Sequence, residues 1–405
     1  MTGGGHADAS VLRRRWDVVV IGAGPAGSTA ARILAARGHA VLLVDRSDFP
    51  RDKVCGDGLI PDALRCLRRA GLYETVARQG FHTDTLSIFS PSGVRVDLPG
   101  EFVTLPRMQL DTLLLRAAVE CGAVFHAGRV TALSSQRHGV QLRFRDSATP
   151  VQARYAVLAT GADASLHPGT AGMAERRADA VALRCYVDSP VGPEELIISF
   201  DRSILPGYAW IFPLGRNRYN IGCGVFHRGE RHRRVNLRRT FAAFTQRFEP
   251  AREVWSARQA STSLLGATLR CGLEPRWAYD GGNVVAAGEV IATTFPFTGE
   301  GIGKAMESAE AAAEHLAAAL AGDADALAAY PRILHEAFRP RYTGYQLAEH
   351  WIASPWVSDL VARGVRRSER LRRAAAGVIS ESVDPRTVFS VRALAAGLLP
   401  WPRWR

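Results

Sequence analysis

A lone cysteine stands in a turn of the stretch RDKVCGDGLIPDAL, residues 51–64, among charged residues and glycines. A buried structural cysteine usually has apolar neighbours and a turn requires no thiol, so Cys55 is a candidate for chemistry. A thiol at this place can tune a neighbouring redox group, assist a protonation or respond to redox state. The alternative is a small residue that is tolerated in a tight turn.

Three aromatic side chains and a run of glycines mark two further candidate sites. Tyr208, Trp210 and Phe212 alternate with other residues in PGYAWIFPLGRNRYNIGCGV, residues 206–225, so a β-strand places all three on one face. That face lies against either the core or an apolar cavity. In PFTGEGIGKAMESA, residues 296–309, closely spaced glycines open an expected helix. The amides of a helix N-terminus stabilise negative charge.

Residues 16–46, WDVVVIGAGPAGSTAARILAARGHAVLLVDR, have the pattern of a dinucleotide-binding strand–helix–strand unit. DVVVI predicts a buried parallel strand, and Gly22, Gly24 and Gly27 give the G-x-G-x-x-G spacing before a helix. Such glycines permit a tight turn, close approach to a pyrophosphate and tight helix–strand packing. Asp45 follows Gly27 by 18 residues, where a carboxylate can accept hydrogen bonds from ribose hydroxyls.

Three later segments favour FAD over a nicotinamide cofactor. Residues 105–116 place Arg107 before a helix, and residues 155–163 form a strand that ends in a glycine turn. Residues 283–310 again run from strand to turn to a glycine-rich helix start. A cofactor contacted by segments spread over most of the chain must be long and extended, which suits FAD.

At these residues the sequence resembles the geranylgeranyl reductase family of FAD-dependent oxidoreductases. Such proteins combine a glutathione-reductase-like dinucleotide fold with a hydroxylase-type substrate domain. The resemblance covers roughly residues 16–330 and is carried by the three stretches quoted first. Tyr208, Trp210, Phe212 and Pro213 match that family's Y-x-W-x-F-P substrate-pocket motif.

The resemblance implies roles for particular residues. Arg107 should help to hold the FAD, the helix after the 296–309 glycines should begin near the flavin's pyrimidine ring, and Cys55 should lie beside the isoalloxazine. The predicted catalytic residues are Cys55, Tyr208 and Trp210, and the predicted substrate-pocket residues are Phe212, Pro213, Phe295 and Pro296. The predicted FAD-binding residues are Gly22, Gly24, Pro25, Ala26, Gly27, Asp45, Arg46, Cys55, Gly56, Arg107, Val130, Gly161, Gly288, Glu289, Gly299, Gly301, Ile302 and Gly303.

Two positions depart from the pattern of related flavoenzymes. Where these usually carry Gly-Asp at the turn beside the ribityl chain, this sequence has Gly288 and Glu289. The longer side chain requires a shifted backbone or a bridging water to reach a hydroxyl. Hydroxylases of the superfamily also carry Asp-Gly after the ATGA strand, whereas here Asp163 is followed by Ala. This second departure weakens a hydroxylase interpretation.

The predicted fold class is α/β. A Rossmann-like FAD-binding domain of the glutathione-reductase type takes residues 16–80, 105–170 and 280–330. An inserted antiparallel β-sheet substrate domain takes residues 81–104 and 171–279, with a hairpin expected within 86–98 around Pro-Ser-Gly. Residues 331–405 are expected to form a helical, arginine-rich C-terminal region.

The composition narrows the classes of partner. The net charge is +12, and only Lys53 and Lys304 are lysines; we expect Lys304 to be solvated, with support of the flavin's charge as the alternative. The arginine runs at 228–239 and 363–373 lack interleaved stacking aromatics, which argues against nucleic acid. They suit a solvated helix face, anionic lipid or a diphosphate substrate. The tail at 392–405 suits either an interfacial anchor or packing on its own domain.

Location and metal content are predicted from the same pattern. The six cysteines show neither metal-ligand spacing nor paired motifs, which indicates a reducing, cytoplasmic setting and no metal site. The N-terminal residues lack the apolar segment of a signal peptide, and no apolar run is long enough to span a bilayer. We therefore expect a cytoplasmic protein, with peripheral contact to a membrane surface as an open alternative.

The favoured function is reduction of a carbon–carbon double bond in an isoprenoid or similar apolar substrate. No second dinucleotide motif is evident, so NAD(P)H or a reduced partner protein must reduce the flavin transiently. A competing hypothesis is an FAD-dependent monooxygenase or halogenase that acts on an aromatic or polyketide-like intermediate. A third is a noncatalytic flavin-binding carrier, against which the motif-rich pocket argues.

Overall fold

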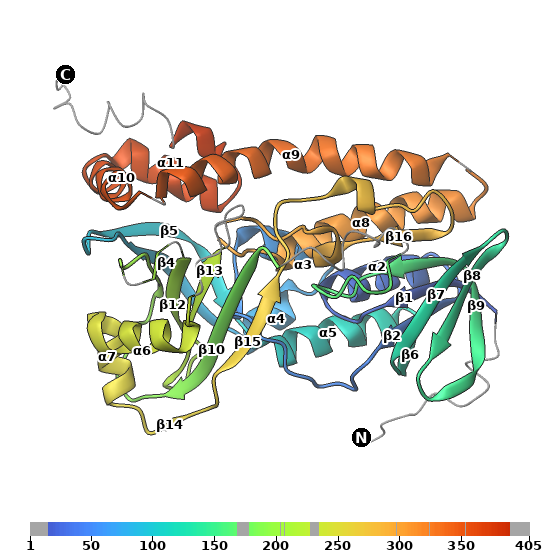
Figure 1. Cartoon of the computed structure of the whole chain (residues 1–405), viewed down its shortest axis with the longest axis horizontal. Helices are drawn as coiled ribbons and strands as arrows, with labels where there is room; N and C mark the ends of the chain where they lie inside the picture. Colours follow the sequence, from blue (N-terminus) through green and yellow to red (C-terminus); the bar gives the residue numbers. More distant parts are fainter. Residues whose placement is uncertain are drawn as a thin grey trace.

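The computed structural model describes residues 15–167, 178–202, 204–205, 207–226, 235–296, 298–323, 325–352 and 354–388. Two β-sheets lie side by side, and helices from the C-terminal part of the chain run along the length of the molecule above them (Figure 1). The predicted tail at 392–405 and most of the arginine run at 228–239 lie outside the described residues.

The first sheet is the dinucleotide-binding sheet. Its parallel strands are β6 (Val124–Ala127), β2 (Val41–Asp45), β1 (Trp16–Ile21), β9 (Ser147–Leu158) and β16 (Val284–Ala286), in that spatial order. Strand β8 (Gly139–Phe144) pairs antiparallel with the first half of β9, and β7 (Val130–Gln136) pairs antiparallel with β8. The continuous apolar runs of β1 and β2 are buried, as expected for strands covered on both faces.

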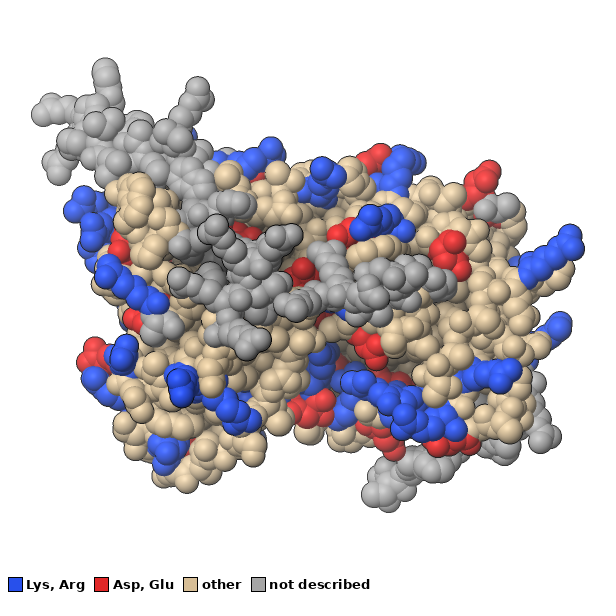
Figure 2. Space-filling view, viewed as in Figure 1, with Lys and Arg blue, Asp and Glu red and all other residues tan. Residues whose placement is uncertain are grey.

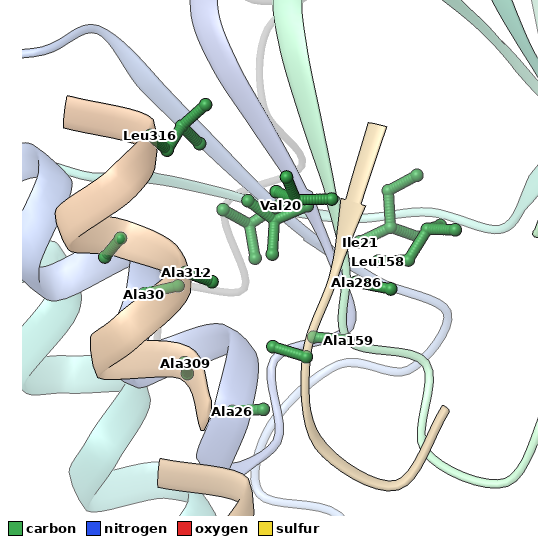
Figure 3. Packing of buried hydrophobic residues seen from close by; sticks show 14 of the residues in the cluster. Val20, Ile21, Ala26, Ala30, Leu158, Ala159, Ala286, Ala309, Ala312 and Leu316 are labelled. Carbon is green, nitrogen blue, oxygen red and sulfur yellow. The ribbon is translucent and has the colours of Figure 1, made fainter. Parts of the chain in front are cut away.

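Helices α2 (Pro25–Ala36) and α8 (Ile302–Leu320) pack together on one face of this sheet. Their contact is built from small side chains: Ala26 and Ala30 of α2 lie against Ala309 and Ala312 of α8, beside Val20 of β1 (Figure 3). Alanines allow the two helix backbones to approach closely, so both N-termini are held near the carboxyl ends of the parallel strands. The helix α5 (Arg107–Glu120) packs on α2.

The second sheet is largely antiparallel. Its spatial order is β14 (Ala260–Ser261), β10 (Ala180–Asp188), β13 (Arg218–Phe226), β12 (Gly207–Pro213), β11 (Leu196–Ser199), β4 (Phe81–Phe89), β5 (Arg95–Thr104) and β3 (Gly58–Leu59), while β15 (Leu265–Leu269) pairs with β10. Strands β4 and β5 form the expected hairpin. Apart from β3, which comes from the cysteine-containing stretch, the strands of this sheet lie between residues 81 and 104 and between residues 180 and 269. The fold class predicted from the sequence is confirmed.

Helices cover the second sheet at both ends. Helices α6 (Leu237–Arg247) and α7 (Glu249–Ser256) bury Phe241, Phe244 and Val254 in a cluster with Ile221 and other residues of the sheet. Near β4 and β5 lie α9 (Ala326–Ile352), α10 (Pro355–Arg367) and α11 (Glu369–Ile379) (Figure 1). The remaining helices are α3 (Pro61–Arg69), α4 (Tyr73–Gln79), and the short turns η2 (Pro275–Trp277), η3 (Gly288–Ile291) and η4 (Pro385–Thr387).

Candidate active site

The glycine turn between β1 and α2 has no room for a side chain at two of its three glycines, Gly22 and Gly27. Gly22 has φ +103°, and a Cβ there would lie 2.2 Å from the carbonyl oxygen of Ala159. A Cβ on Gly27 would lie 1.7 Å from the carbonyl oxygen of Gly22. At Gly24 the Cβ position is open, with only the guanidinium groups of Arg51 and Arg107 within 4 Å. The backbone is therefore exposed at the start of α2, with two cations facing it.

Asp45, at the end of β2, holds this turn in place. Its Oδ2 accepts a hydrogen bond of 2.9 Å from the Ala23 amide, and its Oδ1 accepts one of 3.0 Å from the Ser47 amide. Arg51 and Arg107 both pair with the buried carboxylate of Asp111, at 3.0 Å and 2.7 Å. Arg51 also lies 3.4 Å from Asp45 Oδ2, so two carboxylates face the two guanidinium groups. Both guanidinium groups still reach the open side of Gly24, where their N–H groups can donate to an anionic group.

A cavity of about 840 Å³ begins at this turn and runs between the two sheets. Fifteen of the eighteen predicted FAD-binding residues line it: Gly22, Gly24, Pro25, Ala26, Asp45, Arg46, Cys55, Gly56, Arg107, Val130, Gly161, Glu289, Gly299, Gly301 and Ile302. The other three serve the packing behind the wall. A Cβ on Gly288 would lie 2.8 Å from that of Ala26, and one on Gly303 would lie 2.1 Å from a carboxylate oxygen of Asp62.

The chemistry of this cavity fits FAD along its length. An exposed glycine turn, a helix N-terminus and two arginines at one end suit a pyrophosphate, and Asp45 lies where a ribose is expected. At the other end the cavity reaches the glycines that precede α8. Residues at both ends would hold the cofactor, which supplies hydride chemistry when it is bound.

Glu289 lies in this cavity wall and its carboxylate has local partners. Its Oε1 accepts a hydrogen bond of 3.2 Å from the Arg270 amide, and the Arg270 side chain donates to the Ala162 carbonyl at 2.7 Å. Burial raises the pKa of Glu289, and the nearby Lys53 opposes that rise. The Glu289 carboxylate thus faces the cofactor cavity and is also bound by Arg270, which directly follows β15 (Leu265–Leu269) of the second sheet.

The turn that carries Cys55 is fixed by two buried polar side chains. Asp57 has φ +65° and accepts hydrogen bonds from the Arg107 amide (3.0 Å), the Tyr186 hydroxyl (2.8 Å) and the Asn220 amide (2.8 Å). The same Asn220 side chain also donates to the Cys55 carbonyl at 2.8 Å and accepts from Trp210 Nε1 at 2.8 Å. These bonds lock the turn against β12 and β13.

The glycines on both sides of Asp57 allow this close approach. A Cβ on Gly56 or Gly58 would lie 3.2 Å or 3.3 Å from the ring of Phe212. Cys55 itself is half-buried; burial raises the pKa of its thiol, although the guanidinium of Arg107 acts in the opposite direction. The thiol is therefore kept protonated at neutral pH.

A second cavity, of about 240 Å³, lies on the other side of Cys55 and is lined almost entirely by apolar side chains. Strands β4, β5 and β11 contribute Leu86, Ile88, Val96, Leu98, Leu196 and Ile198, and helices α9, α10 and α11 contribute Tyr345, Ala348, Val361, Ala362, Val365, Ala375, Val378 and Ile379. The C-terminal helices thus form one wall of the apolar cavity.

The two cavities meet at a shared wall. Six residues line both of them: Cys55, Gly56, Tyr208, Gly299, Gly301 and Ile302. Tyr208, Trp210 and Phe212 do lie on one face of β12, with ring centroids 5.8 Å and 6.4 Å apart along the series. Phe212 lines the apolar cavity, whereas Trp210 lines the cofactor cavity. The aromatic face therefore borders cavities rather than core.

The other three predicted pocket residues lie outside the lining of the apolar cavity. The carbonyl of Pro213 accepts a hydrogen bond from the Thr104 hydroxyl. Phe295 is fully buried and stacks on Tyr345, with ring centroids 4.2 Å apart. Pro296 is buried beside it. The structure brings Tyr208 and Phe212 to the apolar cavity and leaves Pro213, Phe295 and Pro296 behind its wall.

The expectation that Lys304 is solvated is wrong. Its side chain is fully buried and its Nζ lies 2.8 Å from Glu381, 2.9 Å from Glu307 and 3.5 Å from Asp62. Arg341 pairs with Glu307 and Glu381 as well. We call these residues the ionic cluster: Asp62, Lys304, Glu307, Arg341, Glu381 and Arg65, which pairs with Glu381 at 2.8 Å. It lies behind the first turn of α8.

Sequence reasoning missed Arg51, Asp57, Asn220 and Glu300, although each lies inside or next to a stretch that drew attention. A lone asparagine in the otherwise apolar strand RYNIGCGVF, and a glutamate between two glycines, were the available signals. Polar residues at such positions are rarely buried unless they have a partner or a role.

Comparisons with known proteins agree with this geometry. A family profile described as an FAD binding domain matches residues 15–335. Menaquinone reductase of Mycolicibacterium smegmatis is 33% identical over 342 residues, which cover 80% of this chain and 81% of that protein. Digeranylgeranylglycerophospholipid reductase 1 of Methanopyrus kandleri is 29% identical over 301 residues, which cover 72% of this chain and 77% of that protein.

Solved structures share the fold over nearly the whole chain. A geranylgeranyl bacteriochlorophyll reductase-like protein from Thermoplasma acidophilum has a TM-score of 0.75 at 21% identity, covering 95% of this chain and 96% of that one. A flavin-dependent brominase has a TM-score of 0.73 at 19% identity, covering 95% and 97%. Identities this low show the fold alone.

Fold, cofactor cavity and family profile together define an FAD-dependent oxidoreductase. Within that class, the chain belongs to the geranylgeranyl reductase family. Among the described residues, no helix combines the length and the apolar character that a membrane span requires.

Proposed function

We propose that this protein reduces carbon–carbon double bonds in the prenyl chain of a quinone or lipid, with FAD as its cofactor. The observation that carries the proposal is the apolar cavity, which meets the cofactor cavity along the wall of Cys55, Tyr208 and Gly299. A prenyl chain held in the apolar cavity can place a double bond at the shared wall, next to the cavity that suits FAD. Relatives named for menaquinone and for digeranylgeranylglycerophospholipid support a prenyl substrate.

The residues of the chain have three tasks in this reaction. Tyr208, Phe212 and the apolar side chains of β4, β5 and β11 hold the prenyl chain and exclude water. The turn at Cys55, fixed by Asp57 and Asn220, sets the distance between substrate and cofactor. When bound, reduced FAD supplies the hydride. We propose NAD(P)H or a reduced partner protein as the electron donor.

The test is a single turnover under anaerobic conditions. The holoenzyme is reduced chemically and mixed with menaquinone, geranylgeranyl diphosphate or a geranylgeranylated glycerol lipid, and flavin absorbance and product mass are followed. We expect reoxidation of the flavin together with the gain of two hydrogen atoms by one acceptor class. Products formed only when oxygen is admitted, and containing oxygen or halogen, would instead establish the monooxygenase or halogenase alternative.

A change at Cys55 tests its place at the shared wall. Cys55→Ala is expected to shift the flavin absorbance spectrum and the reduction potential, and to slow the single turnover, because the side chain borders both cavities. The matched control is Cys121→Ala, since Cys121 follows α5 and lies in neither lining. If spectrum, potential and rate all equal those of the wild type, Cys55 has no role at the flavin.

We also propose that α10 and α11 contact an anionic membrane surface. Trp356, in the first turn of α10, is 70% exposed, and six exposed arginines follow in these two helices: Arg363, Arg366, Arg367, Arg370, Arg372 and Arg373. Several Lys and Arg side chains are visible at the end of the molecule where α10 lies (Figure 2). The same helices wall the apolar cavity, so a lipid-bound chain has a short route into it.

Vesicle binding measures this contact. Replacing Arg366, Arg367 and Arg370 together with glutamine should weaken binding to phosphatidylserine-containing vesicles at low salt on the order of 100-fold, at about 1 kcal/mol for each charge. The control replaces Arg137, Arg143 and Arg154, which are exposed on β8, β9 and the turn before β8 at the opposite end of the molecule (Figure 1). If both triple variants bind the vesicles equally weakly, binding depends on the net charge of the protein and not on a contact made by α10 and α11.

A further inference from the structure

A buried carboxyl group faces the apolar cavity at the start of α8. Glu300 lies between Gly299 and Gly301, which line both cavities, whereas Glu300 lines the apolar cavity alone. Its Oε2 is buried and accepts no hydrogen bond from any described residue. An unsatisfied carboxylate oxygen at an apolar wall is costly unless the carboxyl is neutral or meets a ligand.

The surroundings of Glu300 favour the protonated form. Asp62 lines the same cavity, and its Oδ2 has the Nζ of Lys304 at 3.5 Å but accepts no shorter hydrogen bond from a described residue. Burial, together with the negative charges of Asp62 and Glu381, raises the pKa of Glu300 well above its usual value, while Lys304 opposes this. Two carboxyl groups in an apolar site cannot both ionise without strong repulsion. These surroundings favour the protonated carboxyl of Glu300 over its carboxylate.

The backbone around Glu300 is held on both sides. The Phe295 amide donates a hydrogen bond of 2.8 Å to the Glu300 carbonyl, and the Tyr208 hydroxyl donates to the Thr298 carbonyl. Gly299 has φ +72°, and a Cβ there would lie 3.0 Å from the Tyr208 oxygen. The carboxyl is thus presented to the cavity from a fixed loop, next to the wall that the two cavities share.

We propose that Glu300 is the acid that delivers a proton to the double bond, an inference that rests on the proposed function. In this step the Glu300 O–H bond breaks and one new C–H bond forms, so the carboxylic acid becomes a carboxylate. The second C–H bond would come from hydride, with both electrons, that FAD supplies when it is bound in its reduced form. The alkene becomes an alkane segment, and charge and hydrogen atoms balance.

Two other protonated groups at the shared wall are less suited to this step. The Tyr208 hydroxyl already donates its hydrogen to the Thr298 carbonyl, so that proton is committed to the loop. The Cys55 thiol, whose pKa is raised by burial, is a weaker acid than a carboxyl group. Glu300 combines a stronger acid with a buried Oε2 that accepts no hydrogen bond within the described part of the chain, and the Thr298 side chain is the neighbouring polar group that acts on its carboxyl.

The ionic cluster begins at Asp62, which lines the apolar cavity together with Glu300, and it would be the polar route by which Glu300 regains its proton. Lys304 links Asp62 to Glu381, and Glu381 pairs with Arg65 and Arg341. The side chains of Arg65 and Arg341 are 39% and 36% exposed, so the path ends at solvent. The apolar cavity can therefore exclude water while its acid is recharged from behind.

The test compares Glu300→Gln with Glu314→Gln as holoenzymes. Glu314 lies on the same helix α8, is 57% exposed and pairs with Arg37 at the surface, so it is a matched control. In the oxidised enzyme, infrared spectroscopy should show a carboxylic-acid carbonyl band at neutral pH that Glu300→Gln removes and Glu314→Gln retains. Because the infrared measurement needs no substrate, its result does not depend on the proposed function.

The second measurement is the rate of electron transfer in a single turnover. We expect Glu300→Gln to bind FAD, and to pass electrons from reduced flavin to oxygen, as the wild type does. Its transfer to the prenyl acceptor should fall at least about 100-fold, and Glu300→Asp should recover part of that loss. Glu314→Gln should leave all these rates unchanged.

Either the infrared spectrum or the single-turnover rate can overturn the proposal. A wild-type transfer rate in Glu300→Gln, or the absence of the carbonyl band from the wild type, excludes Glu300 as the acid. If the wild type reduces no prenyl acceptor, the proposed function falls first, and the role of Glu300 falls with it. A normal wild-type turnover with an unaffected variant removes only Glu300, so the two failures are distinguishable.

Discussion

Replacing Gly27 with alanine should weaken FAD binding strongly while much of the remaining fold persists. The new Cβ would lie 1.7 Å from the Gly22 carbonyl oxygen and 3.2 Å from the Ala159 Cβ, and the first of these is backbone. It can be accommodated only if the turn opens and α2 moves away from β1. Overpacking of this kind costs about 3 kcal/mol, so FAD affinity should fall at least about 100-fold.

Flavin content after purification and a titration of apoprotein with FAD provide the measurement. The matched control is Gly38→Ala at the other end of α2, where φ is +86° and no atom lies within 4 Å of the new Cβ. That variant should lose about 1 kcal/mol of stability through backbone strain and keep its FAD affinity. Equal affinities in both variants would show that close packing at Gly27 is not what positions the cofactor.

Replacing Lys304 with methionine should destabilise the protein by about 3–5 kcal/mol. The lysine is fully buried, and its removal leaves Glu307, Glu381 and Asp62 close together with only Arg341 and Arg65 to compensate them. Methionine fills much of the same volume, so the loss reports the charge rather than a cavity. Chemical denaturation at neutral pH measures the free energy of unfolding.

The same variant should depend on pH in a defined direction. Burial raises the pKa of Asp62 from 3.8 to about 6, while Lys304 opposes that rise. A folded-state pKa above the unfolded value means that stability falls as pH rises between the two. Without Lys304 that window widens upward, so the deficit should be larger at pH 8 than at pH 5.

The control for this experiment is Arg332→Met. Arg332 pairs with Glu336 on α9, and both side chains are more than half exposed. Exposed pairs contribute less than about 1 kcal/mol, so this variant should be nearly as stable as the wild type at every pH. A Lys304→Met variant that behaves in the same way would mean that water reaches the ionic cluster freely.

The sequence predicted the cofactor unit well because that unit is local. Strand, glycine spacing, helix and Asp45 lie within residues 16–46, and each constrains its neighbour. The aromatic face of β12 was also predictable, since alternation along a strand fixes which side chains share a face. Whether that face bordered a cavity depended on β4, β5 and the C-terminal helices, which no local pattern identifies.

The environment of Lys304 and the lining of the apolar cavity were not predictable in this way. The partners of Lys304 come from α3, from its own helix and from the segment after α11, so only the folded chain brings them together. Phe295 and Pro296 lie in a loop, where side-chain direction follows from tertiary packing and not from a repeat. The cavity wall formed by α10 and α11 could not be predicted, because it depends on how the helices at 355–379 pack against the second sheet.

Because the two cavities share a wall, a ligand bound in one of them can change the affinity of the other cavity for its own ligand. A prenyl chain bound in the apolar cavity would contact Cys55, Tyr208 and the α8 glycines, which also border the cofactor cavity. Such coupling is reciprocal: the factor by which one ligand strengthens the other is the same in both directions. If a prenyl acceptor strengthens FAD binding, FAD strengthens acceptor binding by the same factor, and the fraction of protein that holds FAD rises with the supply of acceptor.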